Sequence, residues 1–316
     1  MSKQDKPNIL WICTDQQRSD TIHALGNPVI DTPNLDRLCE QGVAFSQAYC
    51  QSAICTPSRT SFLTGLYPSA VNGNYNGNRR LNLPSDVKLI SRHLADIGYT
   101  CGLSGKLHLA SPYPGIEERV DDGITFFKYS HCPFQGLEGG NHYHDWLKQI
   151  GRFDEALDIS NYNPQRGVGA RVRRDIPFEL HHTTWCCDQA MDFIAQTDGK
   201  SPWCMFINAF DPHPAYDAPQ CYEDKYLHRD LPEPNFQEHD LTEQEKLATH
   251  MWQVDFKPPD EATRKNKANY YGMVDLIDEN VGRLLDYLDK NGLRENTIVI
   301  FMSDHGELVG DRGMTG

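Results

Sequence analysis

The sequence predicts an α/β fold in which a mostly parallel central sheet is sandwiched between helices. Apolar runs without a helical period, typical of strands buried on both faces, lie at 8–14, 203–210 and 297–302. Segments with helical spacing alternate with these runs, and this alternation is typical of parallel sheets covered on both sides. The 316 residues are enough to bury a full core.

The remaining elements follow in order along the chain. A capping residue and Pro33 begin a helix that carries Leu35 and Leu38 and ends at Gly42. The other expected elements are a strand over 43–49, a helix over 86–97, a strand over 100–104 and a helix over 183–196. A long amphipathic helix over 262–290 presents one apolar face, formed by Val274, Ile277, Val281, Leu284, Leu285 and Leu288.

Two stretches interrupt the alternation. Residues 111–182 are rich in Gly, Pro, His and Arg, and residues 214–260 are rich in Pro and acidic side chains. We expect both to form long loops or insertions, which in compact domains are usually functional or mobile. The sequence ends a few residues after the last expected strand with no closing element, so we expect a single domain over 1–316 that is truncated.

Composition limits the function classes. The net charge of −14 argues against nucleic acid and anionic membranes as partners, because both favour a basic surface. An anionic substrate would therefore need positive charge concentrated in its pocket. The first residues contain no apolar signal segment, and no apolar run approaches the ~18 residues of a membrane span. We expect a cytoplasmic protein whose ten cysteines are reduced.

The strongest local motif is Cys55-Thr56-Pro57-Ser58-Arg59, followed by Thr64-Gly65. Pro57 suits the beginning of a helix, which would place Cys55 at the positive end of the helix dipole. Arg59 lies about one turn further on and could bind the same anion. An isolated cysteine is more often a small buried apolar residue. Spacing alone leaves a cysteine phosphatase or a simple anion site open.

This motif resembles the formylglycine signature of the type I sulfatases, in the alkaline phosphatase superfamily, and the resemblance extends over essentially the whole chain. It implies that a maturation enzyme oxidises Cys55 to formylglycine, whose hydrate is the nucleophile on a divalent metal. It also implies a sulfatase-like fold with a smaller C-terminal subdomain, which this sequence lacks.

Two further motifs resemble the metal-binding segments of that family. Asp15-Gln16 follows the first expected strand, although a bare Asp-Gln also suits an ordinary turn, and Ser303-Asp304-His305-Gly306-Glu307 follows the last. The carboxyl ends of parallel strands meet at one edge of a sheet. The implied ligands are Asp15, Gln16, Asp304, His305 and modified Cys55. Oxygen-rich ligation favours Ca²⁺, Mg²⁺ or Mn²⁺ over zinc, with Ca²⁺ the commonest in the family.

The remaining catalytic candidates come from two other resemblances. Gly105-Lys106-Leu107-His108 resembles a sulfatase motif in which the lysine holds a sulfate oxygen and the histidine helps to expel sulfate. Asp211-Pro212-His213-Pro214 resembles the segment whose histidine protonates the leaving alcohol or binds sulfate. Out of this context, Lys106 and His108 would suit an exposed loop equally well. With Arg59, these side chains would supply the positive pocket.

Other polar residues have weaker assignments. Asn76, and less so Asn74, matches by spacing a sulfate-contacting asparagine of phosphonate hydrolases, although the plain interpretation of 72–78 is a turn-rich loop. Five more histidines could line a substrate pocket or simply be solvated: His131, His142, His144, His181 and His182.

These resemblances favour hydrolysis of a sulfate ester, with sugar, choline, aryl and alkyl esters all open. One rival is a phosphonate monoester hydrolase or phosphodiesterase, which shares Gln16 but is least similar at Lys106 and His108. Another is a non-catalytic fragment that binds an anion or a partner chain. This rival is serious because the family places another catalytic lysine about a dozen residues after Asp304, where the sequence ends.

Overall fold

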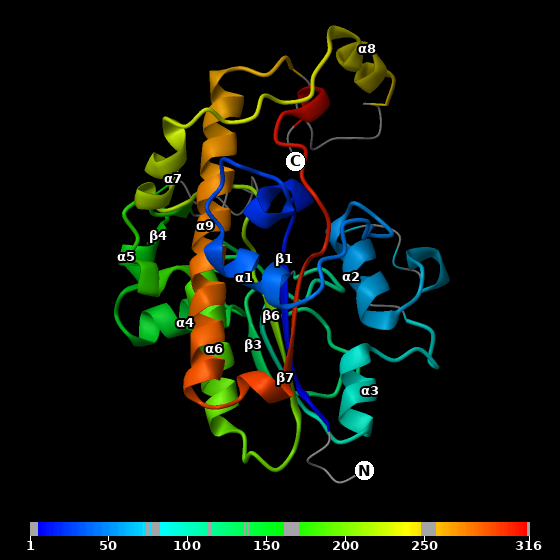
Figure 1. Cartoon of the computed structure of the whole chain (residues 1–316). Coiled ribbons are helices and arrows are strands. Elements are labelled where there is room, and N and C mark those ends of the chain that lie inside the picture. The colour runs from blue at the N-terminus through cyan, green and yellow to red at the C-terminus, as the bar shows by residue number, and fades with distance from the viewer. Residues whose placement is uncertain are drawn as a thin grey trace.

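The computed structural model describes residues 6–71, 73, 76, 83–112, 115–135, 137, 139–160, 171–247 and 257–314, with the backbone alone for 244–247. Its centre is a five-stranded parallel sheet in the order β3-β2-β6-β1-β7 (Figure 1). The strands are β1 (Asn8–Thr14), β2 (Thr100–Gly105), β3 (Ile124–Tyr129), β6 (Trp203–Asn208) and β7 (Thr297–Ser303). A separate antiparallel pair consists of β4 (Leu157–Asp158) and β5 (Arg171–Val172). The predicted parallel sheet is confirmed.

Helices cover both faces of the sheet. They are α1 (Pro33–Gln41), α2 (Cys55–Thr64), α3 (Ile90–Asp96), α4 (His142–Gln149), α5 (Phe153–Ala156), α6 (His182–Gln196), α7 (Gln220–Leu227), α8 (Glu238–Leu247) and α9 (Glu261–Lys290). One layer contains α1, α4, α6 and α9, whereas α2 and α3 lie against the other face (Figure 1). The predicted sandwich of helices around the sheet is therefore confirmed.

The strands divide their side chains between two apolar cores. Leu10 and Ile12 of β1 pack with α6 and α9, whereas Ile9 and Trp11 pack towards α2 and α3. Successive side chains of a strand point to opposite faces, so an apolar strand buried between two helix layers needs no polar alternation. This is why the apolar runs in the sequence predicted β1, β6 and β7.

An N-terminal cap fixes where the long helix α9 begins, and its apolar face packs it against the core. The Asp260 side chain accepts a hydrogen bond from the Thr263 N–H, and Thr263 reciprocates to the backbone of Asp260 as a capping box. Further along α9, Asp278 accepts hydrogen bonds from the N–H groups of Asn34 (3.0 Å) and Leu35 (2.7 Å). A carboxylate at this position stabilises the N-terminus of α1. The predicted helix over 262–290 is confirmed.

Two expectations about secondary structure were wrong. Residues 43–49 form no strand, and Val43, Phe45 and Tyr49 are 79%, 80% and 77% exposed. Their apolar alternation suits a strand, but no described strand lies alongside to form a ladder with it. The stretch 111–182 is more than loops, because it supplies β3 to the central sheet as well as α4 and α5. The segment 214–260, which we expect to be an insertion, contains α7 and α8.

The observed ends of two elements also differ from those expected from the sequence. The strand expected over 203–210 ends at Asn208, and the helix expected over 86–97 begins only at Ile90. The apolar run of the strand continues through Ala209 and Phe210 into a buried loop, so hydrophobicity alone does not mark where this strand ends. Among the described helices, none is both long enough and apolar enough to cross a membrane.

Candidate active site at the carboxyl edge of the sheet

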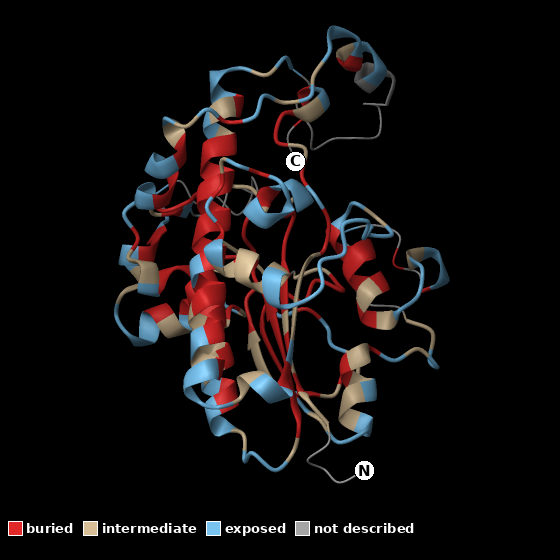
Figure 2. Cartoon of the chain, in the orientation of Figure 1, coloured by how far each residue is buried: buried red, intermediate tan, exposed pale blue. Residues whose placement is uncertain are grey.

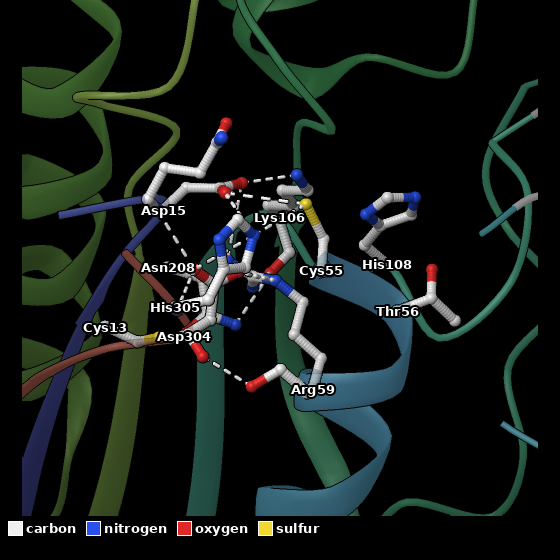
Figure 3. Close-up of polar contacts among 12 residues, drawn as sticks. Cys13, Asp15, Cys55, Thr56, Arg59, Lys106, His108, Asn208, Asp304 and His305 are labelled. Atoms are coloured by element: carbon white, nitrogen blue, oxygen red, sulfur yellow. Dashed lines mark hydrogen bonds and ion pairs between the residues drawn. The ribbon is translucent and has the colours of Figure 1, made fainter. Parts of the chain in front are cut away.

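Charged residues follow three of the five strands at their carboxyl ends. Asp15 comes directly after β1, Lys106 after β2 and Asp304 after β7 (Figure 3). All three are almost completely buried. Backbone hydrogen bonds at the sheet edge hold them in place. Asp15 N–H donates to Asp211 O (3.2 Å), Lys106 N–H to Asn208 O (3.0 Å) and Asp304 N–H to Thr14 O (3.1 Å). This convergence is what the parallel topology predicts for the edge where α/β proteins carry their ligand sites.

Helix α2 brings Cys55 to the same edge. The helix begins at Cys55 itself, two residues before Pro57, so the thiol lies at its N-terminal end as predicted. The Ser58 hydroxyl donates to Asp304 O at 2.5 Å, and this hydrogen bond ties the first turn to the end of β7. The Asn76 side chain accepts from the Thr56 N–H at 2.9 Å and caps the helix. Cys55 is therefore fixed relative to both carboxylates.

Four of the five predicted metal ligands form one compact group. One ligand atom from each of Asp15, Cys55, Asp304 and His305 lies within 4.8 Å of all the others. Ligands on opposite sides of a Ca²⁺ ion are about 4.6–5.2 Å apart, so the spacing fits a single ion of this kind. The Cys55 Sγ lies 3.3 Å from His305 Nε2 and 3.6 Å from Asp15 Oδ1.

The hydrogen bonds around His305 and Gln16 also fit a cation. His305 Nδ1 lies 2.9 Å from Gly306 O, which can only accept, so this nitrogen carries the proton and Nε2 presents its lone pair to the group. The Gln16 side-chain amide donates to Glu307 Oε2 at 3.0 Å. Its carbonyl oxygen Oε1 is buried and has no hydrogen-bond partner. An unpartnered buried oxygen is costly, and a cation would satisfy it.

Two buried cations lie against these carboxylates. Arg59 Nε donates to Asp304 Oδ2 at 2.9 Å, and Arg59 Nη2 lies 3.6 Å from Asp15 Oδ2. Lys106 Nζ donates to Asp15 Oδ2. Burial alone would raise the pKa of Asp15, but the positive charges of Lys106 and then His213 hold it well below its usual value.

The two cations remain charged despite their burial. Burial would lower the pKa of Lys106, but the negative charges around it, Asp15 first and then Cys55 and Asp304, together raise this pKa. Burial likewise opposes the charge of Arg59, and Asp304 then Asp15 raise its pKa. Arg59 Nη2 is buried without a hydrogen-bond partner, so one donor of the guanidinium stays available for an anionic oxygen.

His108 and His131 form a pair beside Cys55. Their rings meet edge to face with centroids 4.4 Å apart, and the Nδ1 atom of each is buried without a hydrogen-bond partner. In Figure 3 His108 lies on the side of Cys55 away from Asp15. Burial, followed by the positive charge of Lys106, lowers the pKa of both rings well below the usual value. Both imidazoles are therefore neutral near pH 7.

His213 lies in the loop after β6 and is partly exposed. Its ring packs on Phe210 with centroids 4.5 Å apart, and its Nδ1 is 2.5 Å from Pro214 O. The carbonyl accepts only, so Nδ1 holds a proton and Nε2 is the nitrogen left for exchange with a substrate. Its contribution to the lowered pKa of Asp15 shows that it is within electrostatic range of the cluster.

The structure thus brings together Cys55, Arg59, Lys106 and the predicted metal ligands, with His108 and His213 at the sides. Asn76 reaches the site as a helix cap, and its contact with sulfate stays a prediction. Asn74 lies outside the described residues. The other histidines make structural hydrogen bonds: His142 accepts from Tyr129 N–H, His144 contacts Pro133 O, His181 caps α6 and His182 contacts Ser130.

Sequence reasoning missed three residues that support the site. Ser58 ties α2 to β7, as described above. Asn208, at the end of β6, donates from Nδ2 to Lys106 O at 2.6 Å and accepts from Lys106 N–H at 3.0 Å. Glu117 accepts hydrogen bonds from the loop that carries His108. Ser58 belongs to the Cys55 motif and could have been found there, whereas no local pattern marks Asn208 or Glu117.

The fold and the site together define an α/β protein with a candidate metal-dependent active site at the carboxyl edge of a parallel sheet. Residues 7–316 match the profile of the Sulfatase family, and the chain belongs to that family. It is 30% identical over 332 residues to an arylsulfatase of Clostridium perfringens, covering 97% of this chain and 64% of the relative. It is 29% identical to the multifunctional alkaline phosphatase superfamily protein PehA of Trinickia caryophylli, covering 98% of this chain and 65% of that one.

A solved structure has the same fold. The phosphonate monoester hydrolase of Agrobacterium radiobacter superposes with a TM-score of 0.78 at 23% identity, covering 98% of this chain and 65% of that one. This likeness shows the fold alone. The chain thus spans about two thirds of the length of these relatives.

Proposed function

We propose that the protein hydrolyses sulfate esters at this site, with a nucleophile supplied by Cys55 after its oxidation to formylglycine. The observation that carries the proposal is the position of Cys55. Its Sγ lies at the N-terminal end of α2, next to His305 and Asp15, in a cluster with two buried cations. Membership of the Sulfatase family supports the same reaction.

The two cations would bind the sulfate group. Lys106 places a point charge beside Asp15, and Arg59 offers its unpartnered Nη2 donor. Both are held by carboxylates at the sheet edge, so they need no rearrangement when negative charge develops on the transferred group. Stabilisation of this charge by preorganised donors in a dry site is usually the largest catalytic contribution.

The residues present fit a divalent cation. Asp15, Gln16, Asp304 and His305 would hold it, together with the oxygen that replaces the Cys55 sulfur after oxidation. A thiolate would favour a softer metal, whereas the oxidised side chain completes an oxygen-rich set suited to Ca²⁺, with Mg²⁺ or Mn²⁺ as alternatives. When bound, the ion would act as a Lewis acid and lower the pKa of the nucleophilic hydroxyl.

The histidines would move the protons. His213 would give a proton from Nε2 to the leaving alcohol, because its Nδ1 is already bonded to the Pro214 carbonyl oxygen. His108, which is neutral, would accept a proton from the side chain derived from Cys55 while sulfate is released. The two histidines thus divide the acid and base roles between the leaving group and the nucleophile.

The substrate is proposed only as a class, a sulfate ester of a small molecule or a saccharide. The arylsulfatase of Clostridium perfringens is the most informative relative here, so an aryl sulfate is the first substrate to test. A formylglycine-generating maturation enzyme is a required partner of this proposal. Cytoplasmic location and the absence of nucleic-acid and membrane partners stay predictions.

The first test is tandem mass spectrometry of the tryptic peptide 38–59, from protein made in a host with the maturation machinery. An aldehyde at position 55, with Cys39 and Cys50 still thiols in the same peptide, supports the proposal. Cys55 left as a thiol would contradict it and favour the anion-binding fragment. Hydrolysis of an aryl sulfate should then be lost on chelation and restored by Ca²⁺.

The rival phosphonate monoester hydrolase is supported by Gln16 and by the fold of the Agrobacterium enzyme. Rates on an aryl sulfate and on an aryl phosphonate monoester separate the two. A higher kcat/KM for the sulfate supports the sulfatase, and a higher value for the phosphonate supports the rival. Lys106→Ala should weaken sulfate-ester hydrolysis selectively if Lys106 holds a sulfate oxygen.

A further inference from the structure

A buried carboxylate without a role so far lies next to the loop that carries His108. Glu117 is 3% exposed. Its Oε2 accepts from the His108 N–H at 2.7 Å, and its Oε1 accepts from the N–H groups of Leu109 (2.8 Å) and Ala110 (3.2 Å). The Tyr129 hydroxyl at the end of β3 donates to Oε2 at 3.1 Å. Four donors therefore converge on one carboxylate.

The backbone at His108 needs such support. Its φ is +55°, in the left-handed region that residues other than glycine rarely adopt, so the surrounding contacts must hold it there. Three successive N–H groups that point to one side form a concavity that binds an anion. Here the anion is supplied by the chain itself, nine residues further on.

We propose that Glu117 is a positioning residue, which holds the strained 108–110 loop so that the His108 imidazole is directed at Cys55. The chemical role of His108 in this statement rests on the proposed function. The hydrogen bonds described above join Glu117 to backbone N–H groups and to the Tyr129 hydroxyl, and none of them joins it to Cys55. Its effect on the reaction is therefore transmitted through His108.

A carboxylate is required, rather than any polar group of that size. Each Glu117 oxygen accepts two hydrogen bonds, so both must be acceptors. In Glu117→Gln one oxygen becomes an NH₂ group that faces two donors. Two of the four hydrogen bonds are lost with almost no change in volume, and the loop loses the contacts that offset its strain.

The first experiment measures hydrogen exchange and does not depend on activity. Amides of residues 108–110 should exchange on the order of tenfold faster in Glu117→Gln than in the parent protein, because their acceptor is lost. The control is Glu118→Gln, the exposed neighbour, in which these amides should keep their parent rates. Equal rates in both variants would overturn the proposal, even if the protein had no activity.

The second experiment is a double-mutant cycle on ester hydrolysis. Glu117→Gln should lower kcat/KM on the order of 100-fold, the loss expected when a catalytic group is misplaced by about 1 Å. In a His108→Ala background the same change should have almost no further effect, because both variants remove one function. If Glu117→Gln lowers kcat/KM by the same factor in both backgrounds, Glu117 does not act through His108. A general structural role would give that result.

The two experiments also separate this proposal from the proposed function. A parent protein without hydrolytic activity would refute the function, whereas the exchange rates would still decide whether Glu117 holds the loop. If Glu117→Gln does not fold, Tyr129→Phe removes a single donor and tests the same contact. It should raise exchange at 108–110 relative to the parent protein by less than tenfold, because only one of the four donors to Glu117 is lost, and unchanged rates would contradict the proposal.

Discussion

Helices α9 and α2 are both deeply buried, but for different reasons (Figure 2). The buried side of α9 includes Val281, Leu284, Leu285 and Leu288, which pack in the apolar core with α6. Eight of the ten residues of α2 are buried, and five of those are polar: Thr56, Ser58, Arg59, Thr60 and Ser61. Burial of α9 comes from the hydrophobic effect, whereas burial of α2 is tied to hydrogen bonds and ion pairs at the site.

This difference separates stability from function. Burying apolar surface stabilises a fold by about 25 cal/mol per Å². Burying charges costs free energy that pairing only partly returns, so a buried ion pair is weak evidence of stabilisation. We therefore expect substitutions in α9 to change stability and leave the chemistry intact. Substitutions in α2 should remove activity even where the fold survives.

The largest expected effect tests the α2 side of the comparison. Cys55→Ala should lower kcat on the order of 10⁶-fold, as the loss of a nucleophile does, and change the free energy of unfolding by about 1 kcal/mol or less. The measurement is ester hydrolysis together with urea unfolding. Cys50→Ala, an exposed thiol in the same segment, is the matched control. Activity that survives in Cys55→Ala would place the nucleophile elsewhere.

Arg59→Met is the variant that should disturb both properties. It leaves the carboxylates of Asp15 and Asp304 buried without this partner, so unfolding should become easier by about 3–5 kcal/mol and hydrolysis should be lost. The control is Arg37→Met, which breaks a partly exposed pair with Asp289 (2.6 Å) and should cost about 1 kcal/mol or less. Equal losses for the two variants in denaturant unfolding would contradict the buried role of Arg59.

Leu284→Ala tests the expectation that substitutions in α9 change stability and leave the chemistry intact. The residue is 1% exposed within the apolar core, and its truncation should destabilise the protein by about 2–5 kcal/mol. Measured well below the melting temperature, kcat/KM should equal that of the parent. Ile298→Ala, at a 49% exposed position, serves as a control with a smaller loss. If kcat/KM is lower than in the parent although Leu284→Ala is fully folded, α9 also affects the geometry of the site.

The smallest effect concerns a polar contact of α9. Burial raises the pKa of Asp278 to about 6, from a usual value of 3.8. Between these values the unfolded chain loses the proton first, so stability should decrease as pH rises from about 4 to about 6, by up to about 3 kcal/mol. Asp278→Asn should lose this slope. Parallel stability curves for parent and variant over this range would refute the assignment.

The sheet and most of the site were predictable because parallel strands leave a strong signal. β1 and β7 are apolar runs followed at once by Asp15 and by Asp304-His305, and topology alone brings those ends together. The cluster therefore follows from strand ends rather than from long-range details. The order of strands in the sheet, in contrast, depends on contacts between segments far apart in the sequence.

The failures had physical causes as well. β3 is preceded by Gly123 and lies in a stretch rich in loop residues, so the composition of that stretch did not indicate a core strand. Residues 43–49 have the alternation of a strand, but pairing decides whether a ladder forms. Glu117 was invisible because its partners are backbone N–H groups, which any sequence offers. The sequence has thirteen histidines, and only the fold shows that the His131 ring packs against His108.

Gly105 joins the sheet to the site through a single close approach. A Cβ at this position would lie 2.1 Å from the carbonyl oxygen of Asn208, and its φ of +95° suits glycine. Any side chain here would force β2 away from β6 and shift Lys106, the next residue. A mutational scan would therefore record Gly105 as essential although it has no chemistry. In an alignment or a screen, the absence of substitutions at Gly105 would therefore reflect the close spacing of β2 and β6.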